Sequence, residues 1–230
     1  MTKNGLLKTL LITYLLITNT NSFGQELPPR TIFNDYFDAI YNKDSILNIK
    51  TLRTTYVADT DKMSIKLEAD LKSPNLKLIQ AIAEGQVFSK LSFDGEKAIQ
   101  TTPYGTVSIQ GVELSNLKQT SSPFPELDFQ ETAINKGLTQ LEDLTEVYKI
   151  QMSEFTFSFY DKQTHLKLQT ETQKIVNGNK NKQLIKYQDY RAYQGILIPN
   201  TLVISSGNNQ LTYRLESVNI NTEIPTSEFN

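Results

Sequence analysis

The sequence predicts a mainly β protein with a few α-helices, in which a curved antiparallel sheet holds helices against its apolar side. Apolar and polar residues alternate in many short segments, and this period of two indicates strands with one apolar and one solvated face. Turns rich in Asn and Gly join these segments, as in antiparallel hairpins. Helical periodicity is strong only near the N-terminus. One amphipathic helix is too little to fill a flat sandwich, so a sheet curved around its helices is favoured.

The N-terminus carries an export signal. Two lysines precede an apolar run from Leu10 to Ile17, and a polar stretch then ends in small residues. Ser22 and Gly24 occupy the −3 and −1 places of a signal-peptidase site, which predicts cleavage before Gln25. The apolar run is about half the roughly 20 residues that span a bilayer, so an uncleaved membrane anchor is the weaker alternative. The chain has no cysteine, so it offers no thiol for lipidation and no disulfide.

We therefore expect a signal peptide at residues 1–24 and a single domain at residues 25–230, exported to the periplasm and not lipidated. This domain has 206 residues, which is enough for one core. It carries 21 basic against 25 acidic side chains, a net charge of −4 with the charges interspersed. Nucleic-acid binding needs a clustered basic surface, and so does attraction to anionic lipid headgroups. The sequence predicts neither a nucleic-acid partner nor stable membrane insertion, and we expect a monomer.

The first predicted element of this domain is an amphipathic helix at residues 32–41, with Thr31 as its N-cap. A short helical turn at residues 43–50 follows. The helix can simply plug the sheet, or it can lie over a cavity as a movable lid, and both alternatives stay open. Its apolar stripe consists of Ile32, Phe33, Tyr36, Phe37 and Ile40.

Strand patterns begin at residue 52. Residues 63–71 show the clearest alternation, with Met63, Ile65 and Leu67 on the apolar side. A turn at residues 73–75 follows, and Asp-Gly at 94–95 is the strongest hairpin signal in the chain. The other strands predicted in this half are residues 52–58, 76–83, 87–93 and 98–101.

The middle of the chain is less regular. Residues 111–119 have helical spacing over about two turns. Two prolines flank Phe124, so this segment cannot be an interior strand. With Leu127 and Phe129 it is a candidate for a flap that packs into the concave side of the sheet. Alternation resumes from Gly137.

The closing part, Phe155 to Ile220, is a meander of five alternating segments. Turns at residues 161–165, 177–181, 192–195 and 206–209 separate the segments. Such a meander predicts one apolar and one solvated face, and no catalytic motif interrupts it.

No enzyme site emerges from the residue types present. The only histidine, His165, falls in a predicted hairpin turn, and the chain has no cysteine, which argues against zinc and against a histidine-dependent nucleophile. The acidic pairs at 59/61 and 142/143 lie in polar turns, where solvated charge is the expected role. We expect no enzymatic activity, no metal and no cofactor.

An apolar concave surface is the feature that remains, and it suits an acyl chain or another lipid. The alternative is an interior that the helices fill completely. Either parity of a strand can face the concavity, and the parity chosen for residues 63–71 rests on their strict alternation. The predicted lining residues are Phe33, Phe37, Met63, Ile65, Leu67, Leu91, Phe93, Phe124, Phe155 and Phe157.

The order of these features resembles the periplasmic lipoprotein carriers of the outer-membrane lipoprotein-sorting (LolA-like) superfamily, especially exported members from Bacteroidetes-type bacteria. The resemblance spans the whole domain and rests on strand and turn patterns rather than on one specific motif. The residues that carry it are the opening segment 32–53, the turn and strand at 73–78, the hairpin at 93–105, the block at 160–207 and the closing segment 216–229.

The resemblance implies an unclosed half-barrel of antiparallel strands whose helices cover the concave face. It also implies a periplasmic binding protein that carries lipid or lipoprotein acyl chains from an inner-membrane transporter to an outer-membrane acceptor. Ser73 stands where the carriers have an arginine that helps to hold the lid closed, and serine offers no guanidinium. This departure weakens the transfer interpretation more than the binding one. An envelope sensor, or a structural protein with a filled interior, is the alternative on the same fold.

Overall fold

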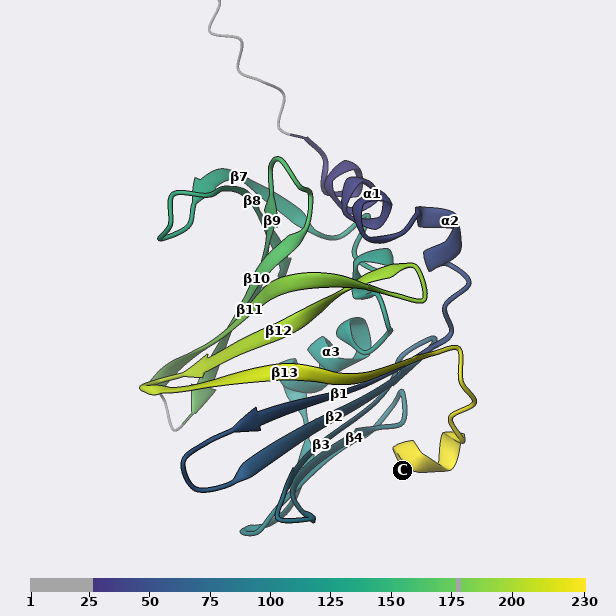
Figure 1. Cartoon of the computed structure of the whole chain (residues 1–230), viewed down its shortest axis with the longest axis vertical. Helices are drawn as coiled ribbons and strands as arrows, with labels where there is room; N and C mark the ends of the chain where they lie inside the picture. The colour runs from purple at the N-terminus through teal and green to yellow at the C-terminus, as the bar shows by residue number, and fades with distance from the viewer. Residues whose placement is uncertain (1–26, 177–178) are drawn as a thin grey trace, which may run out of the picture.

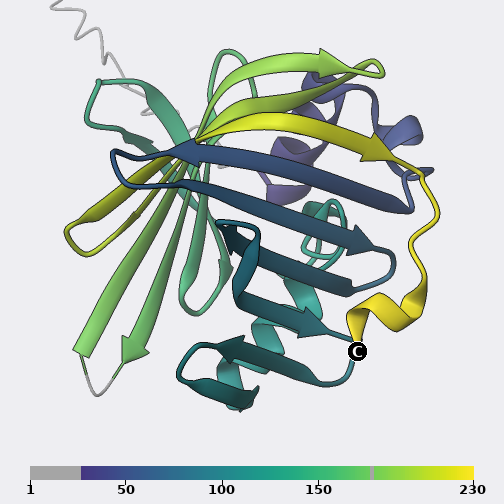
Figure 2. The same ribbon diagram turned by 60° about the horizontal axis from the view of Figure 1, so that its bottom comes forward.

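The computed structural model describes residues 27–176 and 179–230, and within these ranges it omits the side chains of 174–176 and 179–180. Within this part of the chain, 13 strands form a single antiparallel sheet in the order β6-β5-β4-β3-β2-β1-β13-β12-β11-β10-β9-β8-β7 (Figures 1 and 2). The sheet is unclosed, with β6 and β7 at its edges. The predicted fold class, a mainly β chain with an unclosed antiparallel half-barrel, is confirmed. The predicted signal peptide, residues 1–24, lies outside the described residues.

The strands follow one another as hairpins on either side of the pairing between β1 and β13, which joins the start of the sheet to its end. The strands are β1 (Thr51–Asp59), β2 (Ser64–Lys72), β3 (Leu76–Ala83), β4 (Gln86–Phe93), β5 (Ala98–Thr102), β6 (Gly105–Ile109), β7 (Ile134–Gln140), β8 (Glu146–Ser153), β9 (Thr156–Asp161), β10 (Lys167–Val176), β11 (Asn179–Tyr193), β12 (Ile196–Ser206) and β13 (Asn209–Ile220).

Three α-helices and two 3-10 turns accompany the sheet in the described residues. Figure 2 shows α1 and α3 behind the curved strands, on the concave side of the sheet. None of the described helices combines the length and the hydropathy needed to cross a bilayer. The helical elements are α1 (Pro29–Ile40), α2 (Lys43–Ile46), α3 (Gly111–Thr120), η1 (Pro125–Leu127) and η2 (Thr226–Phe229).

Helix α1 begins at Pro29, three residues before the predicted start. Its N-cap is Pro28, without a side-chain cap bond, so the predicted N-cap Thr31 lies inside the first turn. Proline is well suited to the first helical position, because its fixed φ matches the helix and its missing N–H is not needed there. The predicted stripe is fully buried, with the Phe33 and Phe37 side chains 0 % exposed. The stripe packs on residues from β8, β9 and β12, namely Ile150, Met152, Tyr160, Ile196 and Ile198.

The segment after β6 provides a second cover. Helix α3 buries one side chain, Leu117, in a small cluster with Phe93, Ala98 and Ile109. The chain then turns through η1, where Phe124 and Phe129 pack into the same core as α1. Phe124 and Phe129, predicted as parts of a flap, therefore belong to the core that α1 covers.

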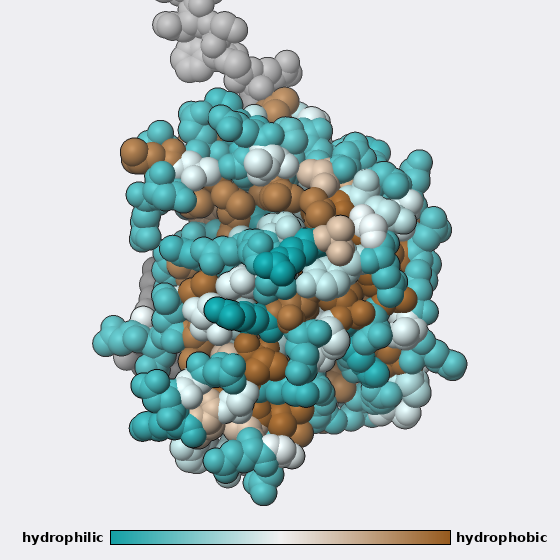
Figure 3. Space-filling view, viewed as in Figure 1, coloured by the Kyte–Doolittle hydropathy of each residue, from teal (hydrophilic) through white to brown (hydrophobic). Residues whose placement is uncertain are grey.

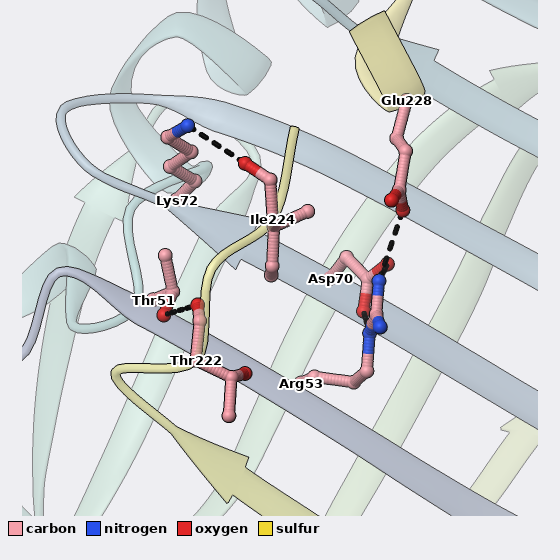
Figure 4. A network of polar contacts seen from close by, with 7 residues as sticks. All are labelled: Thr51, Arg53, Asp70, Lys72, Thr222, Ile224 and Glu228. Carbon is pink, nitrogen blue, oxygen red and sulfur yellow. Dashed lines mark hydrogen bonds and ion pairs between the residues drawn. The ribbon is translucent and has the colours of Figure 1, made fainter. Parts of the chain in front are cut away.

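The C-terminal tail crosses the outside of the sheet (Figure 4). Arg53 donates two hydrogen bonds to Asp70, at 2.6 and 2.7 Å, and a third to Glu228 in η2 at 2.9 Å. Lys72 Nζ donates to the carbonyl oxygen of Ile224 at 2.8 Å. These bonds hold the tail against β1 and β2.

An apolar contact completes the attachment of the tail. Ile224 and Phe229, each 1 % exposed, pack on Leu76 and Leu78 of β3. The outer face of β3 is therefore covered by the chain's own end, while its inner face turns toward α3.

Candidate functional site

A cavity of about 770 Å³ lies between α3 with η1 and the concave face of the sheet. This volume falls within the range of about 300–1,000 Å³ that is typical of small-molecule pockets. One wall comes from α3 and from β3, β4 and β5, and the other from β8 to β11. The lining residues are Lys77, Leu91, Gln100, Val112, Glu113, Asn116, Leu117, Thr120, Pro125, Glu126, Met152, Phe155, Thr156, Ser158, Lys167, Thr170, Thr172, Gln173, Gln183 and Tyr187.

The strand register defines which side chains face this cavity. Partners in an antiparallel pair project to the same face. Leu91 pairs with Gln100 on β5 and with Ile79 on β3, which places these side chains on the concave face. On the other wall, Thr170 pairs with Ser158, and both line the cavity.

Both walls combine apolar and polar groups. The wall near α3 offers Leu91, Val112 and Leu117 beside the polar side chains of Lys77, Gln100, Glu113, Asn116 and Thr120. The opposite wall is mostly hydroxyl and amide groups, because the concave parity of β10 carries threonines. The site therefore combines apolar surface with many hydrogen-bonding groups, which fits an amphiphilic ligand better than a plain hydrocarbon. The polar side chains of this wall are Thr156, Ser158, Thr170, Thr172, Gln173 and Gln183.

A buried ion pair lines the cavity. Lys167 Nζ donates to Glu126 Oε1 at 2.6 Å, and the Tyr160 hydroxyl donates to the same oxygen at 2.9 Å. The ammonium also lies 5.5 Å from the ring centre of Tyr36 and 5.3 Å from that of Tyr187. Burial works against the charge of Lys167, but the Glu126 carboxylate outweighs it, so the pKa of Lys167 is raised. For Tyr160, by contrast, burial is the main reason that the pKa is raised, because the ionised form is the charged one.

This pair leaves one polar atom without a partner. Glu126 is 1 % exposed, and among the described residues nothing hydrogen-bonds to its second oxygen, Oε2. A buried carboxylate oxygen without a donor is costly. Glu126 lies in a segment that the sequence indicated only as a flap, and no sequence pattern marked it as a buried acid.

A second charged side chain lies under α3. Lys77 projects from the concave face of β3, and its Nζ donates to the carbonyl oxygen of Thr120, the last residue of α3, at 2.7 Å. Burial lowers the pKa of Lys77 to about 8. One signal could have found it: Lys77 has the same parity as Ile79, Ala81 and Ala83, so a lysine interrupts an otherwise apolar face.

The residues predicted to line an apolar site occupy several places. Leu91 and Phe155 line the cavity. Ile65 and Leu67 lie on the concave face and pack in a separate cluster around Tyr56. The structure thus brings two of the predicted residues to the cavity wall and two to the neighbouring part of the same face.

The remaining predicted residues lie away from the cavity wall. Phe33, Phe37 and Phe124 are in the core beneath α1, and Phe93 is 0 % exposed in the cluster beneath α3. Met63 precedes β2 in the hairpin turn and is exposed.

Phe157 lies on the outer face of the sheet. Its neighbour Ser158 lines the cavity, and adjacent strand residues point to opposite faces. The ammonium of Lys149 lies 4.6 Å from the centre of the Phe157 ring. Lys149 and Phe157 therefore form a cation–π contact outside the cavity.

The described residues contain no group of three or more His, Asp or Glu side chains arranged to hold a metal ion. His165 has a φ of 60° in the turn between β9 and β10, and its backbone N–H donates to the carbonyl oxygen of Asp161. This placement matches the predicted turn position.

Some apolar side chains of the described residues are exposed on the molecular surface. Polar side chains cover most of the face seen in Figure 3, and apolar ones gather in patches between them. Large exposed apolar groups lie near hairpin tips, among them Val87, Phe88 and Tyr104. Scattered exposure of this kind is normal for folded proteins.

The architecture is similar to that of solved structures. No protein-family model matches the sequence, and no curated protein matches it either. A solved structure of a LolA superfamily protein from Nitrosomonas europaea matches with a TM-score of 0.54 at 8 % identity, over 89 % of this chain and 98 % of that one. An outer-membrane lipoprotein-sorting protein domain from Vibrio parahaemolyticus matches with a TM-score of 0.48 at 10 % identity, over 87 % and 95 % of the two chains. The resemblance predicted from the sequence is therefore confirmed for the fold: over most of its length, the chain is built like a LolA superfamily protein.

Proposed function

We propose that this protein is a periplasmic binding protein that holds an acyl chain or another lipid in the cavity beneath α3. The observation that carries the proposal is the cavity of about 770 Å³ on the concave face of a LolA-like sheet. Its apolar side chains would accept hydrocarbon, and its polar side chains would accept the oxygen and nitrogen atoms of a headgroup.

The energetics favour a lipid over a small polar ligand. Burying a methylene group contributes about 0.8 kcal/mol. About ten buried methylenes would therefore contribute about 8 kcal/mol before the cost of immobilising the chain. A small polar ligand would have to offset the cost of immobilisation mainly through hydrogen bonds. Each hydrogen bond contributes only about 1 kcal/mol net.

We further propose that binding serves transfer of lipid or lipoprotein toward the outer membrane, with an inner-membrane transporter and an outer-membrane acceptor as partners. The LolA-like fold supports this role, and so does the export signal expected from the sequence. The protein would act without a cofactor and without catalysing a reaction.

The alternative function, an envelope sensor or structural protein with a filled interior, has one observation in its favour. Beneath α1 the concave face is filled, since Phe33 and Phe37 are 0 % exposed. Ligand capture decides between the two functions, because the concave face is filled beneath α1 and has a cavity beneath α3.

Native mass spectrometry and lipid extraction of protein purified from a periplasmic fraction test the proposal. We expect a co-purifying lipid in the wild type, and little or none in Leu91→Trp, which adds volume to the cavity wall. Lys90→Trp is the matched control, because the adjacent residue points to the opposite face of β4. A wild-type protein that carries no lipid and captures no fluorescent fatty acid would support the sensor or structural alternative instead.

A further inference from the structure

Lys77 is a charged side chain in the cavity, and few groups are placed to stabilise its charge. Its ammonium has three N–H donors, of which the Thr120 carbonyl oxygen accepts one. In the part of the chain that the structure describes, no ion pair involves Lys77. The contact with Thr120 places the cation at the C-terminal end of α3, where the helix dipole favours positive charge. That interaction orients the ammonium but does not neutralise it.

The surroundings of Lys77 make its charge expensive. Leu91 and Leu117 line the same cavity as Lys77, and apolar surroundings disfavour an ammonium ion. Burial accordingly lowers the pKa of Lys77 to about 8, with no opposing charge among the causes. A methionine or leucine here would continue the apolar parity of β3 at no such cost.

The other charged groups of the cavity do not neutralise Lys77. Glu126 and Lys167 form an ion pair with each other at 2.6 Å. Glu113 lies in the first turn of α3, seven residues before Thr120, which corresponds to about 10 Å along the helix. The end of the cavity beneath the last turn of α3 is therefore positively charged.

We propose that Lys77 binds the anionic headgroup, a carboxylate or phosphate, of an amphiphile whose hydrocarbon chain lies along α3 in the cavity. This inference rests on the proposed lipid-binding function and specifies the ligand class. The two N–H groups that Thr120 leaves unused donate to the headgroup oxygens. Gln100 and Asn116, which also line the cavity, supply further hydrogen-bonding groups on this wall. Pairing with an anion relieves the cost of the partly buried cation, so the headgroup contributes both specificity and affinity.

Displacement of the neutral dye Nile red by matched amphiphiles at pH 7 tests the inference. The competitors are laurate, dodecyl phosphate, 1-dodecanol and inorganic phosphate, which separate charge from chain. In the wild type, the two anionic amphiphiles should compete about tenfold better than dodecanol, which corresponds to one charge-assisted hydrogen-bonding contact. In Lys77→Met this preference should disappear, because the anionic amphiphiles lose their charge-assisted contact, while dodecanol still displaces the dye. Lys90→Met, which removes a lysine from the opposite face of β4, should keep the preference.

The possible outcomes separate this inference from the proposed function. Nile red binding without any preference for the anionic amphiphiles, or a preference that survives in Lys77→Met, overturns the role of Lys77 and leaves lipid binding intact. If inorganic phosphate competes as strongly as dodecyl phosphate does, the site binds small anions rather than lipid headgroups, and the inference is overturned. Failure of the wild type to bind Nile red or any amphiphile overturns the lipid-binding function, and the headgroup site with it. Folding is not in question for the variant, because dodecanol binding reports an intact cavity.

Discussion

Replacing Lys77 by methionine should make the ligand-free protein more stable at neutral pH. The pKa of Lys77 falls from 10.5 to about 8 on folding, because burial disfavours the ammonium. A shift of this size corresponds to about 3 kcal/mol of lost stability at pH 7, before solvent in the cavity screens part of it. Methionine has a similar volume and no charge, but it gives up the hydrogen bond to the Thr120 carbonyl oxygen, which contributes about 1 kcal/mol. The expected net gain is about 1–2 kcal/mol.

The pH dependence gives the sharper test. The folded pKa of Lys77 lies below the unfolded one, so between pH 8 and 10.5 the unfolded state binds more protons. Wild-type stability should therefore rise with pH across this window, relative to the variant. The advantage of Lys77→Met should be full at pH 7 and close to zero at about pH 10.

Urea denaturation followed by far-UV circular dichroism measures this difference, since the chain contains no tryptophan. The protein must first be stripped of lipid by refolding, because a bound anion would neutralise Lys77 and hide the effect. Lys90→Met is the control, and its stability relative to the wild type should be the same at both pH values. A Lys77→Met protein that is less stable at pH 7, or whose advantage does not change with pH, would refute the argument that Lys77 is an uncompensated cation.

Three further substitutions test, by chemical denaturation, the ion pair of the cavity, the attachment of the C-terminal tail and the packing of α1. Lys167→Met leaves the Glu126 carboxylate buried without its counter-ion, so it should lower the free energy of unfolding by about 3–5 kcal/mol. The double variant with Glu126→Gln should recover much of this loss. Equal stability of the single and double variants would contradict the ion-pair interpretation. Arg53→Met removes both hydrogen bonds from the buried Asp70 and should cost about 2–3 kcal/mol, and insensitivity of this loss to salt would fit the burial of that carboxylate. Phe37→Ala removes a 0 % exposed ring beneath α1 and should cost about 3–5 kcal/mol; a loss under 1 kcal/mol would show that α1 is not a fixed part of the core.

The sequence was sufficient for the architecture because hairpins are local. Strand alternation and turn residues are properties of neighbouring positions, so residues 63–71 and the meander at 155–220 could be recognised without knowledge of the rest. Asp94 shows the same principle at a turn, where its side chain accepts hydrogen bonds from the backbone N–H groups of Glu96 and Lys97. The predicted start of α1 was wrong by three residues, because the helix begins with Pro29 and has no side-chain cap that would mark its start.

The site was harder to predict because the two faces of a strand look alike from the sequence. In β9 the sequence pattern predicts that Phe157 faces inward, yet Ser158 faces the cavity and Phe157 faces outward beneath Lys149. The pairing of Ser158 with Thr170 and Ile150 in the two adjacent hairpins does not reveal which face is covered. That depends on α3 and η1, which come from a separate part of the chain and form the other side of the cavity. The polar residues of an alternating strand normally face solvent, whereas here some of them face a cavity. Glu126 and Lys167 likewise meet only through the folded topology.

The packing of the two covering helices decides which of them can act as the lid. Helix α1 buries five side chains, whose removal from the sheet would cost about 1.5–3 kcal/mol each, or about 10 kcal/mol together. Helix α3 buries one, Leu117, for which the same estimate gives about 2 kcal/mol. Of the two alternatives predicted for the N-terminal helix, these magnitudes favour the plug. Helix α3 covers the cavity and carries the carbonyl oxygen that orients Lys77, so the element that is cheapest to displace is also the one that contacts the proposed headgroup site.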